Sequence, residues 1–251
     1  MHRFFLPPAE CKAGEFTLPE SESHHGLHVL RLRERERLVV LDGAGTELLC
    51  EVISTDHRQL KIRVLQRNPI PPLPCHVTLA QAITRGKSME MIVQKATELG
   101  VSRIVPIRSE RSVVSVDDEN GARKVGRWEA TVIEAIKQCG SAWLPHLEPP
   151  MTSAAFLSRS ERFDLVLVAS LRAGSGHPRQ IFERYLAENR RKPKTVCMWV
   201  GPEGDFTPAE MNAIQSSGAL PVTLGPLVLR SETAAIYCLS MINYETQSPA
   251  D

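Results

Sequence analysis

The sequence predicts a two-part protein, in which a small β domain precedes a larger α/β domain with a mainly parallel sheet. Apolar residues alternate with polar ones between residues 38 and 64, which is typical of half-buried strands. A proline-rich segment, residues 68–74, follows. From Val77 onward, short apolar strands alternate with segments of helical periodicity, which indicates an α/β fold.

The first part contains a predicted β-hairpin or meander. Strands are expected at residues 38–41, 48–53 and 60–64, with a turn at Asp42-Gly43-Ala44-Gly45. This turn leads into a strand and not a helix, so its glycines do not open a dinucleotide-binding motif. Because proline lacks a backbone donor, residues 68–74 are expected to hold no sheet ladder, and the domain boundary belongs there.

The second part alternates strands with helices. Strands are predicted at residues 77–83, 104–107, 165–169, 195–200 and 220–224. Apolar residues share one helical face in the segment that contains Met89, Ile92, Val93, Ala96 and Leu99. Trp128, Val132 and Ile136 have the same spacing, so we expect them in the core of a further helix.

Two turns in the last quarter each follow a predicted strand and precede a predicted helix. After the first, Thr207-Pro208-Ala209-Glu210 combines an N-cap hydroxyl, a proline at the first helical position and a capping glutamate, and Gly218 ends the helix. After the second, a helix is predicted from Ser231 or Glu232, with Ala235, Leu239 and Ile242 inward.

Ligands bind at the carboxyl ends of strands in open α/β sheets. We therefore expect the two loops to lie side by side and to form a binding site made mostly of backbone. Ordinary tight turns would produce the same spacing, so spacing alone leaves both interpretations open.

These turns resemble the signature of the SPOUT class of S-adenosylmethionine-dependent RNA methyltransferases. More closely, the chain resembles the RsmE-type family, which methylates N3 of a uridine in 16S ribosomal RNA. The matching segments are Gly201-Pro202-Glu203-Gly204, Leu224-Gly225, Leu229-Arg230, Glu232-Thr233, Arg85-Gly86, Met89-Glu90, the run 94–101, Ser109-Glu110-Arg111, Gln138-Cys139-Gly140, Arg3-Phe4-Phe5, Val29-Leu30-Arg31 and Asp42-Gly43. Each string is short, but their joint order spans nearly the whole chain, which makes the resemblance specific.

The chain departs from the family pattern at three places. Asp205 stands where the family often has a second glycine, and Leu227 stands where arginine is common. The segment Val168-Ala169-Ser170-Leu171 lacks the His-Pro that many members carry, so Ala169 is expected to contact the cofactor through its backbone only.

The resemblance implies a SPOUT-type α/β fold with a C-terminal trefoil knot at residues 75–251, preceded by a PUA-like RNA-binding β-barrel at residues 1–70. It implies a homodimer that uses S-adenosyl-L-methionine to methylate N3 of a specific uridine in the decoding region of 16S rRNA, within the small ribosomal subunit. The implied cofactor contacts are Ala169, Val200, Gly201, Pro202, Glu203, Gly204, Leu224, Gly225, Leu229 and Thr233. The implied RNA contacts are Arg3, Arg31, Arg85, Lys87 and Arg111.

Arg230, Glu232 and Glu203 are the candidate catalytic residues. A guanidinium stays charged and can donate two hydrogen bonds to one group, so Arg230 suits the negative charge that spreads onto uracil carbonyl oxygens. Arg230 could instead pair with Glu232 and fix the loop. Glu203 and Glu232 could accept the departing proton or stabilise the positive sulfonium, and the sequence does not separate these roles.

Composition gives no global support for nucleic-acid binding, because 30 Lys+Arg face 29 Asp+Glu and the net charge is +1. Any RNA surface must be local. Arg31, Arg33, Arg35 and Arg37 alternate with Glu34 and Glu36, so a solvated segment fits them as well as a phosphate contact does.

Several other classes of site are disfavoured. Gly86-Lys87-Ser88 resembles the end of a phosphate-binding P-loop, but Gln81 replaces its first glycine. The six cysteines form no C-x-x-C pair, and His24, His25 and His28 lack an acidic or cysteine partner, so we expect neither disulfides nor a metal. Without a membrane span or a signal peptide pattern, a cytoplasmic protein is expected.

Two rival functions remain. The first is an RNA-binding ribosome-assembly protein without catalysis, against which the intact Gly201, Gly204 and Gly225 argue. The second is a SPOUT methyltransferase that acts on transfer RNA, which the match at the amino terminus disfavours.

Overall fold

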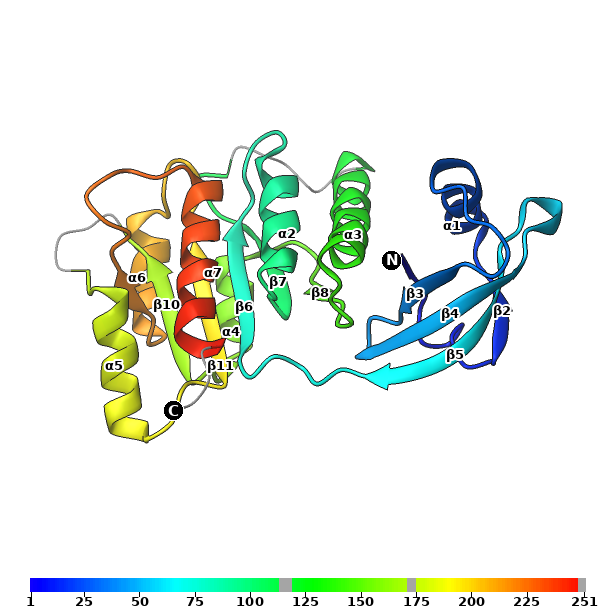
Figure 1. The fold of residues 1–251 in the computed structure, drawn as a ribbon. Coiled ribbons are helices and arrows are strands. Elements are labelled where there is room, and N and C mark those ends of the chain that lie inside the picture. Colours follow the sequence, from blue (N-terminus) through cyan, green and yellow to red (C-terminus); the bar gives the residue numbers. More distant parts are fainter. Residues whose placement is uncertain (113–118, 171–174, 248–251) are drawn as a thin grey trace. The chain divides into compact units, whose positions relative to one another are not determined.

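The computed structural model describes residues 1–112, 119–170 and 175–247, and the chain divides into two units. Unit 1 comprises Met1–Pro72 together with Ile133–Leu144, and unit 2 comprises Leu73–Val132 and Pro145–Asp251. Each unit is built on a sheet of its own (Figure 1). Residues 133–144 lie beyond the boundary that the sequence predicts, yet they group with unit 1.

Unit 1 is built on a sheet whose described strands follow the order β1-β3-β4-β5-β2. Its strands are β1 (His2–Phe5), β2 (Glu15–Thr17), β3 (Arg37–Leu41), β4 (Thr46–Ser54) and β5 (Lys61–Pro69). Its helices are α1 (Glu20–His24), the π-helix η1 (His25–Val29) and the 3-10 helix η2 (Asp56–Arg58). β1 is parallel to β3, and the other pairs are antiparallel. The predicted hairpin between residues 38 and 53 is confirmed.

Asp42 shapes the turn between β3 and β4. Its Oδ1 accepts hydrogen bonds from the backbone N–H groups of Ala44 and Thr46, both at 2.8 Å. Gly43 and Gly45 have φ angles of +73° and +94°, which side chains disfavour. The turn therefore sets the register that buries the alternating apolar residues of β3 and β4.

β5 extends further than the sequence predicts. Asn68 pairs with Glu47 and Pro69 pairs with Thr46, so the expectation that no ladder forms from residue 68 is wrong at these two positions. β2 pairs with β5 only at residues 61–63. The far end of β5 therefore has a neighbouring strand on one side only, and a proline without an N–H is tolerated there.

Arg3 on β1 binds the carboxyl end of α3 (Glu119–Cys139). Its Nη1 donates hydrogen bonds to the carbonyls of Lys137, at 3.5 Å, and Gln138, at 3.1 Å, which a helix end leaves without helical partners. Gly140 has a φ of +81°, and a Cβ there would lie 2.9 Å from Cζ of Arg3. A glycine therefore suits this close approach. The contact is one of several that tie residues 133–144 to unit 1.

Unit 2 is built on a second sheet, in which every described pairing is parallel. Its strands are β6 (His76–Ala82), β7 (Arg103–Arg108), β8 (His146–Leu147), β9 (Met151–Thr152), β10 (Leu165–Ala169), β11 (Thr195–Val200) and β12 (Leu220–Val222). The strand order is β12-β10-β11-β6-β7-β8, and β9 also pairs with β7. The predicted strands at 165–169 and 195–200 match β10 and β11 at both ends, and the predicted parallel sheet is confirmed.

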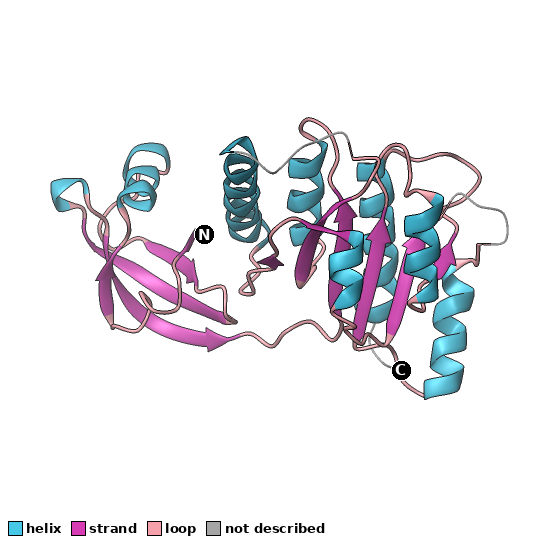
Figure 2. Cartoon of the chain, turned by 180° about the vertical axis from the view of Figure 1, so that it is seen from behind, coloured by secondary structure: helices cyan, strands magenta, loops and turns pink. Residues whose placement is uncertain are grey.

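Helices cover both faces of this sheet (Figure 2). They are α2 (Ser88–Glu98), α4 (Ser153–Ser158), α5 (Pro178–Asn189), α6 (Pro208–Ser216) and α7 (Ser231–Gln247), together with α3. α2 contacts α7, and α4 contacts α6. Trp199 on β11 packs in one core with Phe156 of α4 and Met211 of α6. Among the described residues, none of the helices is long and apolar enough to span a bilayer.

The strand order places one strand between those that lead into the two glycine turns. β10 lies between β11 and β12, so these two strands are not direct neighbours. Chain order alone gives no sign of this insertion. The carboxyl end of β10 thus lies between those of β11 and β12, and residues of both turns line one pocket there.

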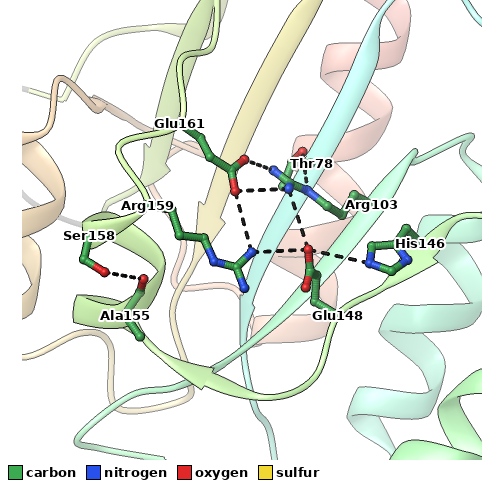
Figure 3. A network of polar contacts seen from close by, with 8 residues as sticks. All are labelled: Thr78, Arg103, His146, Glu148, Ala155, Ser158, Arg159 and Glu161. Carbon is green, nitrogen blue, oxygen red and sulfur yellow. Dashed lines mark hydrogen bonds and ion pairs between the residues drawn. The ribbon is translucent and has the colours of Figure 1, made fainter.

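A network of charged side chains lies near the amino ends of β7 and β8, at the end of the sheet opposite the carboxyl ends of its strands (Figure 3). Arg103 pairs with Glu161 and lies 3.7 Å from Glu148, while Arg159 lies 3.3 Å from Glu148 and 3.6 Å from Glu161. The hydrogen bond from Arg103 lowers the pKa of Glu161 below its ordinary value. The charges are paired with one another, so this network stabilises the fold.

Asp164 connects the amino ends of β10 and β11. Its carboxylate accepts two hydrogen bonds from the Arg191 guanidinium, both at 2.8 Å, and one from the Lys194 N–H, at 2.7 Å. The Thr195 N–H also donates to it, at 3.3 Å. The Arg191 guanidinium is the main reason that the pKa of Asp164 lies well below its usual range.

Asp164→Asn is expected to lower the free energy of unfolding by about 1–3 kcal/mol at pH 7, because a charged acceptor of several hydrogen bonds is lost. The folded-state pKa is depressed, so the wild-type contribution is complete above the unfolded pKa of about 3.9 and disappears as pH falls towards the folded value. Urea unfolding of both proteins from pH 7 down to about pH 3.5 should show the difference shrinking in acid. The exposed Glu188→Gln variant is the control, and a gap independent of pH would contradict this assignment.

Candidate functional site

The carboxyl ends of β10, β11 and β12 open into a pocket. Three loops and the start of α7 form its walls. The lining residues are Ala169 and Ser170 at the end of β10, residues 200–203 and 205 at the end of β11, Leu224 and residues 227–229 after β12, and Ser231 and Ala234 on α7.

The first turn is a tight reversal directly after β11. The Asp205 N–H donates to the Pro202 carbonyl at 2.9 Å, and Asp205 has a φ of +57°. Aspartate adopts this left-handed conformation more readily than most residues do, because its short side chain can bond to nearby backbone. Here Asp205 Oδ1 accepts from the Phe206 N–H at 2.7 Å. Asp205 therefore meets the left-handed backbone requirement of this turn.

The helix after this turn begins as predicted. Thr207 and Glu210 form a capping box, with Pro208 in the first turn. The Glu210 carboxylate is buried and also accepts hydrogen bonds from the Glu110 N–H, at 3.1 Å, and from Ser153, at 3.2 Å. Glu210 thus connects the start of α6 with the segment after β7 and with α4.

A buried polar chain holds the turn from inside the unit. Gln81 on β6 is completely buried, and its Nε2 donates to Ser231 Oγ at 3.0 Å. Ser231 Oγ in turn donates to the Gly201 carbonyl at 2.7 Å. The first turn is therefore tied to the start of α7 and to the central strand, so both sides of the pocket are fixed together.

Two exposed contacts hold the outside of the same turn. Arg111 Nη1 donates to the Gly204 carbonyl at 2.7 Å, and Glu203 Oε1 accepts from the Arg85 N–H at 3.3 Å. Arg85 and Arg111 follow β6 and β7, respectively. The loops after four neighbouring strands thus converge on one edge of the sheet.

The loop after β12 forms the outer wall. Gly225 has a φ of +102°, which requires glycine, and its N–H donates to Thr223 Oγ1 at 3.3 Å. Leu227 and Val228 line the pocket but are 72% and 79% exposed. This wall is therefore apolar and largely open to solvent.

The charged residues that line the pocket are of one sign. Among the described residues that line it are two carboxylates, Glu203 and Asp205, and no lysine, arginine or histidine. Such a site suits a ligand with a positive charge better than a phosphate. The P-loop alternative also loses support, since the segment at Gly86 forms no part of the lining.

Seven of the ten predicted cofactor contacts line this pocket, which supports their grouping. They are Ala169, Val200, Gly201, Pro202, Glu203, Leu224 and Leu229. Gly204, Gly225 and Thr233 do not line it. Gly204 instead offers its carbonyl to Arg111, Gly225 provides the left-handed bend, and Thr233 is exposed on α7.

Six lining residues were missed: Ser170, Asp205, Leu227, Val228, Ser231 and Ala234. Ser231 and Ala234 are three residues apart at the start of α7, so helical spacing could have indicated them together. Ser170 directly follows β10, whose last residue was already predicted to contact the cofactor. Leu171 lies outside the described residues.

The predicted catalytic residues differ in their positions. Glu203 lines the pocket, whereas Arg230 and Glu232 lie at the start of α7 outside the lining. The Arg230 side chain is exposed, and its carbonyl accepts from the Ala234 N–H at 2.8 Å. Among the described residues there is no ion pair between Arg230 and Glu232 within 4.0 Å, so the loop-fixing alternative lacks its expected contact.

The predicted RNA contacts fall in both units. Arg85 and Lys87 are exposed on either side of Gly86 in unit 2, where Arg111 holds Gly204. In unit 1, Arg31 is exposed with a φ of +56°, and Arg3 binds the end of α3. Arg3 therefore has a structural role in addition to any contact with RNA.

Other reactive side chains do not assemble into a site. His24 and His28 have ring centroids 4.6 Å apart, but the described residues contain no group of three potential metal ligands. The cysteines are unpaired, and all except Cys139 are buried. Burial raises the pKa of Cys11 to about 11 and that of Cys50 to about 12, so these thiols are not activated nucleophiles.

Comparison with known families identifies two matches in this chain. The RNA methyltransferase domain matches residues 71–243, and the RNA methyltransferase PUA domain matches residues 18–65. The Bacillus subtilis ribosomal RNA small subunit methyltransferase E is 30% identical, over 98% of each chain.

Two solved structures are similar along nearly their whole length. One, from Legionella pneumophila, was solved with bound SAM and has 32% identity, a TM-score of 0.85 and 96% coverage of both chains. The other is the ribosomal RNA small subunit methyltransferase E of Neisseria gonorrhoeae bound to S-adenosyl methionine, with 28% identity, a TM-score of 0.84 and 97% coverage of both chains.

Ser231→Ala is expected to weaken binding of S-adenosylmethionine about fivefold, because the Gly201 carbonyl and the buried Gln81 amide both lose a partner worth about 1 kcal/mol. Isothermal titration calorimetry measures the dissociation constant directly. Ser240→Ala, an exposed change on the same helix, is the matched control. An unchanged affinity in Ser231→Ala would show that the buried chain does not hold the pocket.

Proposed function

The chain belongs to the ribosomal RNA small subunit methyltransferase E family, and on that premise we propose that it methylates N3 of one uridine in the decoding region of 16S rRNA. The methyl donor is S-adenosyl-L-methionine, and the substrate is the small ribosomal subunit in the cytoplasm. The observation that carries the proposal is the pocket formed by three loops at the carboxyl ends of β10, β11 and β12.

The pocket fits a sulfonium nucleoside in two respects. Its lining includes apolar side chains, and its described charges are the carboxylates of Glu203 and Asp205. Ala169, Val200, Leu224 and Leu229 would hold the cofactor together with residues 201–203, and Gly204 and Gly225 would shape the loops. When bound, the cofactor supplies an electrophilic methyl group.

The reaction moves this methyl group to the uracil N3 as the sulfonium becomes a neutral thioether, and the N3 proton must leave. Arg230 is assigned to the negative charge that develops on the uracil carbonyl oxygens, since its exposed guanidinium has no ion pair with Glu232. Glu203 and Glu232 are the candidate proton acceptors. Glu203 lines the pocket, which favours it of the two.

RNA binding is assigned to exposed cations. Arg85, Lys87 and Arg111 belong to the loops that follow β6 and β7, at the same edge of the sheet as the pocket. Arg31 and Arg3 belong to the PUA-like unit, where they would contact phosphates outside the target base. Since the chain is almost neutral overall, binding should depend on these local groups.

The homodimer and the trefoil knot remain proposals from the family resemblance. Tyr237 and Tyr244 on α7 are 49% and 77% exposed, and such aromatic residues are typical of interfaces. Sedimentation velocity is expected to give twice the mass of the chain. A fully active monomer at assay concentration would contradict the dimer.

The direct test of function uses small ribosomal subunits that lack the modification. After incubation with the protein and S-adenosylmethionine, the RNA is digested and its nucleosides are compared with authentic 3-methyluridine by mass spectrometry. The proposal requires 3-methyluridine in 16S rRNA. A different methylated nucleoside, or product only in transfer RNA, would replace it with a rival activity, and cofactor-independent RNA binding alone would favour an assembly protein.

Arg230→Ala is expected to reduce turnover about 10²- to 10³-fold, because the developing oxyanion loses its charged donor. The affinity for S-adenosylmethionine should stay nearly unchanged, since Arg230 does not line the pocket. Single-turnover kinetics and calorimetry separate the two effects, and Arg190→Ala, on the exposed end of α5, is the control. If turnover and affinity fell equally, Arg230 would be a loop residue instead.

A further inference from the structure

Asp205 places a fixed negative charge in the wall of the pocket. It is half-buried and lines the pocket directly after the Gly201–Gly204 turn. Its Oδ1 accepts from the Phe206 N–H at 2.7 Å, and a Cβ built on Gly201 would lie 3.0 Å from this oxygen. The carboxylate therefore lies close to Gly201, on the side where any other residue would carry its Cβ.

The turn itself restricts the position of the Asp205 carboxylate. Asp205 closes the turn through its N–H to the Pro202 carbonyl, at 2.9 Å, and adopts a φ of +57°. The carboxylate also bonds to the very next N–H, so few rotamers are compatible with the turn. A charge held in this way needs no reorganisation when a ligand enters.

The other charges of the turn leave this carboxylate uncompensated. Arg111 directs Nη1 to the Gly204 carbonyl, and among the described residues Asp205 forms no ion pair with a lysine, arginine or histidine within 4.0 Å. Glu203, the second carboxylate of the lining, is exposed and accepts from the Arg85 N–H. Asp205 is therefore the more buried of the two charges and the one fixed closest to Gly201.

The two forms of the cofactor differ by one charge. S-adenosylmethionine carries a positive sulfonium, whereas the product, S-adenosylhomocysteine, has a neutral thioether and is otherwise almost identical. Both keep the same ammonium, carboxylate, ribose and adenine. A fixed negative charge in the wall of the pocket therefore favours the positively charged donor over the product.

We propose that Asp205 is a specificity-determining residue that makes the pocket prefer the sulfonium donor over its demethylated product. The inference rests on the proposed function and deepens it. It also gives a role to a residue that stands where the family often has glycine. Because the product no longer pairs with the carboxylate, methyl transfer itself weakens cofactor binding and aids product release.

The test compares the dissociation constants of S-adenosylmethionine and S-adenosylhomocysteine by calorimetry, without RNA and without turnover. Asp205→Asn keeps the size of the side chain, the acceptor for Phe206 and the tolerance for left-handed backbone, but removes the charge. We expect the ratio of product to donor dissociation constants to fall about threefold, as for a partly exposed ion pair. The difference from wild type should diminish as salt is raised.

Two further variants separate charge from backbone. Asp205→Gly also removes the charge but relaxes the turn, so it should lower the ratio as much as Asp205→Asn does. Glu188→Gln removes one exposed carboxylate on α5 that does not line the pocket, and should leave the ratio unchanged. Thermal unfolding of each variant shows whether the fold is kept.

An unchanged ratio in Asp205→Asn would overturn the inference. So would an equal loss for both ligands, because it would assign the carboxylate to the shared ammonium group. A wild-type protein that binds neither ligand would count against the proposed function itself. The two failures are therefore distinguishable.

Discussion

The pocket depends on one buried hydrogen-bond chain, from Gln81 through Ser231 to the carbonyl of Gly201. A site made mostly of backbone has no long side chains to adapt to a ligand, so its loops must be held in place by the fold. Gln81 lies on β6, Ser231 starts α7 and Gly201 directly follows β11, so this chain of hydrogen bonds joins three elements that are distant in sequence. Arg111 at the Gly204 carbonyl and Arg85 at Glu203 hold the same turn from outside. One face of the turn is thereby left for the ligand.

Much of the fold follows from local signals in the sequence. β10 and β11 are short apolar runs with sharp ends, and the capping box of Thr207 and Glu210 fixes the start of α6 through contacts within four residues. Long-range features could not be found in this way. The insertion of β10 between β11 and β12, the two extra ladder positions at Asn68 and Pro69, and the contact between Arg3 and the end of α3 all depend on partners far along the chain.

In the candidate site, too, local sequence signals locate some residues, whereas others depend on long-range contacts. Residues that follow directly from the turns, such as Gly201, Pro202 and Leu224, line the pocket, because strand ends and turns locate them. Ser231 and Asp205 were missed, since their roles depend on a carbonyl across the pocket and on a left-handed backbone angle. Strand and turn signals also do not locate the candidate catalytic residues relative to the pocket. Glu203 belongs to the lining, whereas Arg230 and Glu232 lie beside it. Two similar structures were solved with S-adenosylmethionine, which agrees with a cofactor pocket in this chain. Its two lining carboxylates suit a positively charged donor.

We propose that the backbone of the loops after β11 and β12 holds the cofactor. Hydrogen–deuterium exchange with and without S-adenosylmethionine tests it most directly, because amide protection reports on individual backbone segments. If these loops hold the cofactor, amide exchange slows at residues 201–206 and 223–231 when the cofactor is present and changes little in β1–β5. Protection confined to other segments, or none at saturating cofactor, would contradict it.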